Sequence, residues 1–506
     1  MEMRSARRWW VLAALMLSMI IVGLDSTVLN VALPTLATQL HATTSQLQWI
    51  VDAYILVLGG CMLPLGALAD RLGRKPVLLA GVVVFTTGSL AAAYVGSPAA
   101  LIATRAVMGL GAAVILTVPL AVLPTIFTPA ERPRAIATMM VAMGLGLPLG
   151  PIVGGWLLQH FWWGSVFLLN VPVGVLAVAA LALFLPGSRD AAGARTDLVG
   201  ALTSTAGLVA LVYGVVEAPD HGWTSGAVLG FGGLGVALLA GFAWWESRVA
   251  EPMIDLRLLA RPRFGWGTFC ATVASFAMLG LLFVLPLYLQ AVRGHDPLGT
   301  GVRLLPMIAG LVLGAKAGER AVVRLGARRP IVAGLAVILV GLVWGSTVTV
   351  DTSYLPMACW LGLIGAGMGL TMTPAMDAAL GEVPPERAGS GSALTMALRQ
   401  VGGALGVAVL GSVLNAAYTH RLDVTGLPPA AAHTARESVV AGLEVARTAG
   451  SSALADSATH AYVHAMSTVM LTSAGMAVLG IVVAATLMPA RASAQTSPEE
   501  SATISV

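Results

Sequence analysis

The chain has 506 residues, of which 57% are hydrophobic and only 10% are charged. Soluble globular chains carry about 25% charged residues, so this composition excludes an ordinary water-soluble protein and indicates a chain that is solvated by lipid. The net charge of +4 comes almost wholly from arginines in short gaps between apolar runs, and it does not indicate nucleic-acid binding.

Fourteen segments are apolar enough to cross a bilayer, which takes about 20 residues as a helix. The first follows a basic N-terminus but is too long for a signal peptide, so we expect it to remain as a span. The short polar gaps leave no room for a soluble catalytic domain, and the predicted fold class is an all-α polytopic membrane protein. The predicted spans cover residues 9–31, 47–68, 77–95, 99–123, 134–158, 166–186, 197–216, 225–245, 263–290, 299–323, 330–350, 355–380, 390–418 and 462–488.

The basic residues between the spans predict the orientation. With both termini in the cytoplasm, the termini and the cytoplasmic loops hold 20 of the 28 Lys and Arg residues, and the outer loops hold four. This bias agrees with the positive-inside rule. We therefore expect a multi-pass protein of the cytoplasmic (inner) membrane with both termini in the cytoplasm.

The spans divide the chain into two six-helix bundles with two additional helices between them, fourteen in total. The N-terminal bundle is expected at 1–186 and the C-terminal bundle at 263–488. A linker at 187–262 contributes the two additional spans, and a cytoplasmic tail is expected at 489–506. The one long outer loop, 419–461, is compatible with a solvated loop and with an interfacial helix.

Three ionisable residues of the N-terminal bundle lie well inside apolar spans, where charge is costly and usually functional. A rise of about 1.5 Å per residue places Asp25, Asp52 and Arg105 at similar depths. Burial favours a neutral carboxyl group, whereas a nearby guanidinium favours a charged one. The three residues are therefore predicted to form a proton and substrate relay, and a purely structural charge cluster is the alternative.

The C-terminal bundle has ionisable residues mainly near the inner ends of its spans. Lys316, Glu319 and Arg320 are interpreted as an interfacial cluster. Asp377 is also expected near the inner interface. Arg399 lies well inside its span, deep enough to line a cavity or a gate.

The fifth predicted span carries a glycine repeat that predicts close helix packing. Gly146, Gly150 and Gly154 recur every four residues and make one smooth helix face, and small residues let membrane helices approach closely. Pro148 and Pro151 remove backbone hydrogen bonds and bend the helix. Such a helix suits a sliding surface and a tight seal, although ordinary helix packing also fits the pattern.

The first cytoplasmic loop places one acid and three bases at the membrane surface around a glycine turn. The cluster can act as a salt-bridge latch on an inner gate, and a positively charged anchor is the alternative. It consists of Gly66, Asp70, Arg71, Gly73, Arg74 and Lys75.

Together these features resemble the major facilitator superfamily, in its 14-span drug:proton antiporter branch. The segment from Leu24 to Pro34 resembles the span-1 signature of that branch, and Gly66 to Lys75 resembles the superfamily's loop 2–3 motif. The other similar segments are Arg105 to Gly111, Gly144 to Gly155, Pro286 to Gln290, Leu305-Pro306, and Arg399 to Gly406.

The resemblance implies two bundles that rock around a central cavity, and a proton-coupled multidrug efflux antiporter for hydrophobic and cationic compounds. The exporter motif would be Gly146, Gly150, Pro151, Gly154 and Gly155. The substrate cavity would be lined by Asp25, Asn30, Asp52, Tyr54 and Arg399, and proton coupling would use Asp25, Asp52 and Arg105.

Two further segments bear on the cargo. Trp49 to Tyr54 and Trp163 to Phe167 resemble exporters of quaternary ammonium compounds and dyes. Met108 departs from the span-4 motif, which usually has Gln there, and Arg399 stands where those cation exporters tend to carry an acid. The Arg399-Gln400 pair is more similar to relatives that export antibiotics such as puromycin.

The proton gradient is the expected energy source, and no cofactor is expected. Neither lysine belongs to a Walker A loop, which needs Gly-Lys followed by Ser or Thr. The sequence shows no metal or nucleophile cluster, so we predict a monomeric secondary transporter, not an enzyme, with small molecules, protons and lipid as partners. A dedicated exporter of one antibiotic or endogenous metabolite is the main alternative. The glycine-proline motif argues against a nutrient importer.

Overall fold

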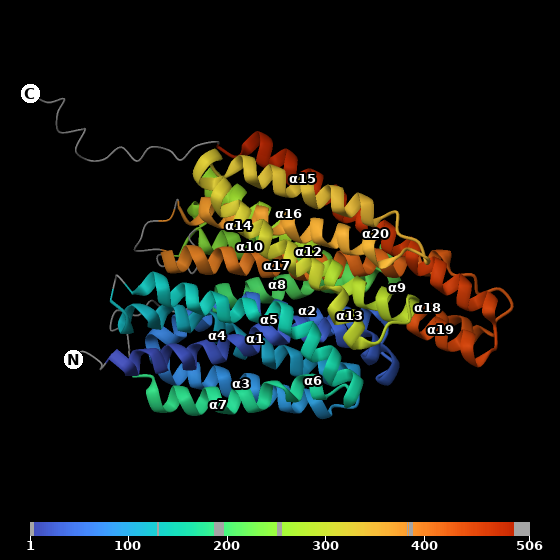
Figure 1. The fold of residues 1–506 in the computed structure, drawn as a ribbon, viewed down its shortest axis with the longest axis horizontal. Helices are drawn as coiled ribbons and strands as arrows, with labels where there is room; N and C mark the ends of the chain where they lie inside the picture. The colour runs from blue at the N-terminus through green and yellow to red at the C-terminus, as the bar shows by residue number, and fades with distance from the viewer. Residues whose placement is uncertain are drawn as a thin grey trace, which may run out of the picture.

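The computed structural model describes residues 5–128, 131–186, 197–249, 256–381, 383 and 388–489. These residues form a bundle of helices, and none of them belongs to a β-strand. The long helices run side by side, and the N-terminus lies at the same end of the bundle as the end of the last helix, on the left of Figure 1. We call this end the terminal end and the opposite end the distal end.

The N-terminal half occupies the lower part of Figure 1. Helix α1 packs against α5 and α7, while α4 packs against α2 and α3. Helix α2 bends by 52° where Pro64 removes a backbone hydrogen bond. The helices of this half are α1 (Ser5–Gln39), α2 (Thr44–Leu72), α3 (Arg74–Tyr94), α4 (Pro98–Ile126), α5 (Arg132–His160), α6 (Ser165–Leu168) and α7 (Asn170–Phe184).

The additional pair of helices contacts both halves of the chain. Helix α8 packs against its partner α10, against α2 of the N-terminal half and against α17 of the C-terminal half. Two hydrogen bonds fix this position: Trp49 Nε1 donates to Glu217 Oε1 at 3.2 Å, and Ser412 Oγ donates to the Val215 carbonyl at 2.7 Å. This linker contains α8 (Leu198–Val216), α9 (Ala218–His221), α10 (Gly226–Glu246) and α11 (Leu256–Leu259).

The C-terminal half occupies the upper part of Figure 1. Helix α16 packs against α14 and α15, and α12 packs against α17. A π-helical turn, η1 (Tyr288–Val292), extends α12 at the distal end. The α-helices are α12 (Pro262–Leu287), α13 (Pro297–Arg303), α14 (Leu305–Leu325), α15 (Arg328–Gly345), α16 (Tyr354–Leu380), α17 (Ala388–Arg421), α18 (Pro429–Glu437), α19 (Val439–Thr448) and α20 (Ser452–Leu487).

The segment 419–461 is largely helical, and many of its residues are exposed. Helices α18 and α19 form most of it at the distal end, and α20 begins within it. The Tyr418 hydroxyl donates to the Ala435 carbonyl at 3.1 Å, and Thr44 Oγ1 of α2 donates to the Glu437 carbonyl at 2.9 Å. These bonds satisfy backbone acceptors of the segment and dock it on both halves.

Twelve helices of the described residues are long and apolar enough to cross a membrane, or thirteen when the bent α2 counts as one span. The predicted number of fourteen is not confirmed by this criterion. Each of the fourteen predicted segments nevertheless contains a helix at the expected place. The chain is thus an all-helical, multi-pass membrane protein.

Candidate functional site

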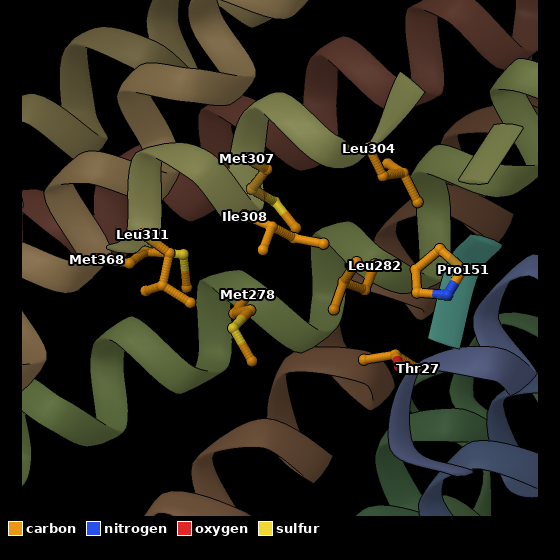
Figure 2. Close-up of a pocket in the computed structure, with 9 residues that line it drawn as sticks. All are labelled: Thr27, Pro151, Met278, Leu282, Leu304, Met307, Ile308, Leu311 and Met368. Atoms are coloured by element: carbon orange, nitrogen blue, oxygen red, sulfur yellow. The ribbon is translucent and has the colours of Figure 1, made fainter. Parts of the chain in front are cut away.

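The two halves meet around a small apolar cavity. Helices α1 and α5 of one half and α12, α14 and α16 of the other supply residues to its wall, as Figure 2 shows. Among the described residues of this wall only Thr27 is polar, and its hydroxyl donates to the Gly146 carbonyl at 3.0 Å. The lining residues are Thr27, Pro151, Met278, Leu282, Leu304, Met307, Ile308, Leu311 and Met368.

Three methionines give this cavity its chemical character. Met278, Met307 and Met368 line it from three different helices (Figure 2). A thioether side chain is flexible and polarisable, so it adapts to apolar and aromatic groups of different shapes. The wall can therefore accept hydrophobic molecules without demanding one pattern of hydrogen bonds.

Asp25 of α1 forms a buried ion pair with Arg105 of α4, with 2.6 Å between Oδ2 and Nη1. The side chains are only 3% and 2% exposed, respectively. The second carboxylate oxygen accepts a hydrogen bond from Asn170 Nδ2 at 3.2 Å, and Asn170 also donates to Ser89 Oγ at 3.0 Å. Loss of either charge would leave the other uncompensated in a buried place, which is energetically costly.

Arg105 also joins α2 to this network. Its Nε donates to the Ile50 carbonyl at 3.2 Å, and its guanidinium carbon lies 4.1 Å from the centre of the Tyr54 ring, a cation–π distance. Arg105 therefore holds α1, α2 and α4 together.

Asp52 lies outside this network. Its side chain is fully buried, and neither carboxylate oxygen has a hydrogen-bond partner among the described residues. Gln48, one turn earlier on α2, donates to two carbonyls of α17, so Asp52 lies on the face of α2 that meets α17. The expected three-residue cluster forms only in part, because Arg105 pairs with Asp25 alone.

None of the five residues that were predicted to line a substrate cavity lines the cavity in Figure 2. Asp25 and Tyr54 belong to the network around Arg105, and Asp52 faces α17. Asn30 is buried and donates to a carbonyl of its own helix at 3.1 Å. Arg399 is partly exposed and contacts α12 and α16. Apolar side chains form the wall itself.

The glycine repeat of α5 packs directly against α1, which confirms the predicted close approach. A β-carbon at Gly146 or Gly150 would overlap atoms of α1, including the hydroxyl of Thr27 at Gly150. At Gly154 it would lie 3.0 Å from Val28 Cγ1. The absence of side chains on this face lets the two backbones come into contact.

The same stretch of α5 also forms a contact between the two halves at the distal end. A β-carbon on Gly155 would lie 2.6 Å from the Leu298 Cα of α13, and the Pro151 carbonyl touches Gly301. Gln159 Nε2 donates to Asp296 Oδ2 across the same boundary at 3.0 Å. The distal ends of the halves are therefore closed on each other here.

The family model that matches the chain is described as the Major Facilitator Superfamily, and it covers residues 15–407. The chain belongs to the Major Facilitator Superfamily. Proteins of this superfamily are transporters, so the prediction of a transporter rather than an enzyme is confirmed.

Two similar proteins and one structure illustrate the relationship. The Tetracenomycin C resistance and export protein of Streptomyces glaucescens is 34% identical over 410 residues, which cover 81% of this chain and 76% of that protein. The Multidrug resistance protein Stp of Mycobacterium tuberculosis is 36% identical over 411 residues, 80% of this chain and 76% of that one. A bacterial homologue of the human lysosomal transporter Spinster shares the fold, with a TM-score of 0.69 and 18% identity over 97% of this chain and 100% of that chain.

The superfamily's loop between α2 and α3 adopts a compact turn. Asp70 and Arg74 form an ion pair at 2.9 Å, and Arg74 also donates to a carbonyl of α4 at 2.9 Å. Gly73 connects the helices with a φ of 107°, a conformation that residues with a β-carbon rarely adopt. Gly66 faces α4, and Arg71 is exposed. These contacts lie inside the N-terminal half, and the role as a latch on an inner gate stays a prediction.

Sequence reasoning missed Asn170, Ser89 and the methionines of the cavity. Asn170 and Ser89 are polar residues inside apolar runs, and this signal could have identified them. The cavity methionines carry no such signal, because an apolar residue in a membrane helix faces lipid, core or cavity with the same composition.

We predict that Gly155→Leu weakens the closure of the distal ends of the halves. A reporter is the pair Gln159→Cys and Asp296→Cys in a chain whose three native cysteines, Cys61, Cys270 and Cys359, are replaced. Overpacking costs about 1–3 kcal/mol, so oxidative cross-linking of the reporter should slow at least about fivefold.

The matched control is Gly241→Leu in α10, where an added β-carbon meets nothing within 4 Å. This control should cross-link at the parent rate. Equal cross-linking in the Gly155→Leu variant would show that this contact does not hold the distal ends together.

Proposed function

We propose that this chain exports hydrophobic, drug-like small molecules, cations among them, from the cell. The methionine-lined cavity between the halves carries the proposal, because it offers adaptable apolar contact at the place where alternating access needs a binding site. The two relatives described above are named for multidrug resistance and for antibiotic export, which supports the same class of cargo.

We further propose that the proton gradient drives export and that the buried pair of Asp25 and Arg105 couples it, without a cofactor. One pH unit supplies about 1.4 kcal/mol per proton. A potential of 100 mV supplies about 2.3 kcal/mol for each charge moved. Exchange of one proton for a neutral compound moves one net charge, so both the pH gradient and the membrane potential drive it. Exchange of one proton for a monovalent cation moves no net charge, so only the pH gradient drives it. A second proton on Asp52 would recruit the voltage for cations as well.

The proposal includes a topology of fourteen spans in the cytoplasmic membrane, with the terminal end in the cytoplasm and a single chain as the functional unit. Helix α5 is 29 residues long and packs along α1, so it would complete the count together with the bent α2. The excess of arginines at the terminal end supports this orientation.

A dedicated exporter of one antibiotic or endogenous metabolite would use the same machinery. The Tetracenomycin C relative, whose name includes both resistance and export, favours this second possibility. A dedicated exporter would protect a pump-deficient host against one compound, whereas a multidrug exporter would protect it against several unrelated ones.

Ethidium efflux tests the proposed function directly. Cells that lack their own pumps and express this chain should lose preloaded ethidium faster than cells with an empty vector, and an uncoupler should abolish the difference. Efflux that persists after the proton gradient has collapsed would contradict proton coupling. The absence of efflux for ethidium and for a panel of hydrophobic antibiotics would contradict drug export.

The Asp25→Asn variant tests the coupling residue. Because Asn cannot exchange a proton, uphill transport by proteoliposomes under an imposed pH gradient should fall to the level of protein-free vesicles. Exchange of labelled for unlabelled ethidium without a gradient should persist, and it also shows that the variant is folded. Uphill transport at the parent rate would remove Asp25 from the coupling mechanism.

The Asp52→Asn variant tests the choice between cations and neutral compounds. Because Asp52 has no hydrogen-bond partner in the described part of the chain, the isosteric amide should leave the fold intact. Hydrogen bonds to charged groups contribute about 1.5–3 kcal/mol, so ethidium export should drop about tenfold. Export of the neutral dye Nile red should stay within about twofold, and an equal loss for both dyes would refute a role in cation selection.

A further inference from the structure

Arg399 of α17 is a membrane-embedded cation without a carboxylate partner among the described residues. Its Nε donates to Ser275 Oγ of α12 at 3.4 Å. Its two terminal nitrogens lie 4.0 Å from the Met396 sulfur and 3.5 Å from the Met372 sulfur. Among the described residues, no Asp or Glu forms an ion pair with it.

The hydrogen-bonding capacity of Arg399 is largely unused. A guanidinium has five N–H donors, and thioether sulfur is only a weak acceptor. One donor meets a hydroxyl oxygen and two point to sulfur, which leaves two without a partner in the described part of the chain. An arginine so placed within a membrane is costly unless an acceptor from outside the protein completes it.

Arg105 of the same protein, in contrast, finds its charge and hydrogen-bond partners within the protein. It is 1% exposed, it pairs with Asp25, and it has a carbonyl and an aromatic ring as further partners. Arg399, by comparison, is only partly buried. Arg105 is therefore the arginine proposed for structure and coupling in the N-terminal half, whereas Arg399 is the more exposed arginine of the C-terminal half.

The position of Arg399 relative to the cavity follows from two of its contacts. Ser275 lies three residues before Met278 on α12, and Met372 lies four residues after Met368 on α16. Met278 and Met368 line the cavity, so the guanidinium lies about one helical turn, roughly 5.4 Å, beyond its wall. Because α12 and α16 run in opposite directions, both contacts displace it toward the same side, the terminal end.

We propose that Arg399 binds an anionic oxygen group, a carboxylate or a phenolate, of the transported molecule. The inference rests on the proposed export function and assigns a class of substrate to it. The apolar body of such a molecule occupies the methionine-lined cavity, and its anionic group reaches one turn toward the terminal end. A carboxylate suits this position, since the planar guanidinium can bind both of its oxygens at once.

The proposal also predicts which molecules are discriminated. An acid and its ester differ by one charge and share the same apolar body, so the cavity treats them alike while Arg399 does not. Cationic compounds gain nothing from Arg399 and are repelled by it. Zwitterions and amphiphilic acids are thus the favoured cargo, with cations accepted in spite of this residue.

The test compares rhodamine B, which carries a carboxylate at neutral pH, with rhodamine B ethyl ester, which has the same ring system without that charge. Binding to the purified full-length protein in nanodiscs and uptake into everted vesicles are measured for both dyes and for ethidium. The variants are Arg399→Gln, which removes the charge, and Arg399→Lys, which keeps the charge but loses the planar fork. Lys316→Gln is the matched control, because it removes an exposed cation of α14 in the same half.

We expect Arg399→Gln to weaken rhodamine B binding about tenfold, in line with a charged hydrogen bond. Binding of the ester should change less than about twofold, and ethidium transport should be unchanged or increased. Arg399→Lys should lie between the parent and the Gln variant, and Lys316→Gln should match the parent for all three dyes.

Three outcomes overturn this inference. The first is a parent protein that binds acid and ester equally, the second is an equal loss of both dyes in Arg399→Gln, and the third is an unchanged affinity for the acid in that variant. Ethidium transport in the same vesicles tests the export function separately. If the protein exports ethidium but does not bind rhodamine B in preference to its ester, only the proposed anion site is refuted. If the protein binds rhodamine B through Arg399 but transports none of the dyes, only the export function is refuted.

Discussion

The ion pair between Asp25 and Arg105 is the interaction on which the arrangement of the N-terminal half depends. Both charges lie in a part of the chain that is shielded from water, so each requires the other. Through its remaining contacts the pair reaches α2, α3 and α7, and so it ties α1 and α4 to the other helices around them. A change in the charge of Asp25 would consequently act on the whole half.

The glycine face of α5 and the methionine cavity are two consequences of one packing arrangement. Where α5 lacks side chains, it lies directly on α1 and α13, and the distal ends of the halves close. Pro151 and Thr27 also face the other half, and there side chains of α12, α14 and α16 complete the wall of the cavity. Close contact on one side of the cavity and adaptable methionines around it fit a site that opens to one side of the membrane at a time.

The arginines embedded in the two halves have different surroundings. In the N-terminal half, the carboxylate of Asp25 satisfies Arg105, and the pair is inaccessible. In the C-terminal half, weak acceptors surround Arg399, and the side chain is only partly buried next to the cavity. Asp52 on α2 of the N-terminal half, which faces α17, is a group of opposite sign that has no hydrogen-bond partner within the described ranges.

The sequence by itself determined the class of the protein and the position of every long helix, because a bilayer demands long apolar segments whatever their neighbours. It also identified the residues whose burial is costly, such as Asp25, Arg105 and Arg399, since charge within an apolar run is visible without a fold. The close-packed face of α5 followed from the spacing of its glycines. These features depend on local composition and helix periodicity alone.

Only the tertiary structure decided which of these residues meet. The pairing of Arg105 with Asp25 and not with Asp52 depends on which faces of α1, α2 and α4 are turned toward one another, and apolar helices with weak amphipathicity do not reveal those faces. The docked helices of 419–461 depend on hydroxyl donors supplied by other helices, Tyr418 of α17 and Thr44 of α2. The cavity is a gap between two halves, and its Leu and Met residues resemble those that face lipid until both walls are in place.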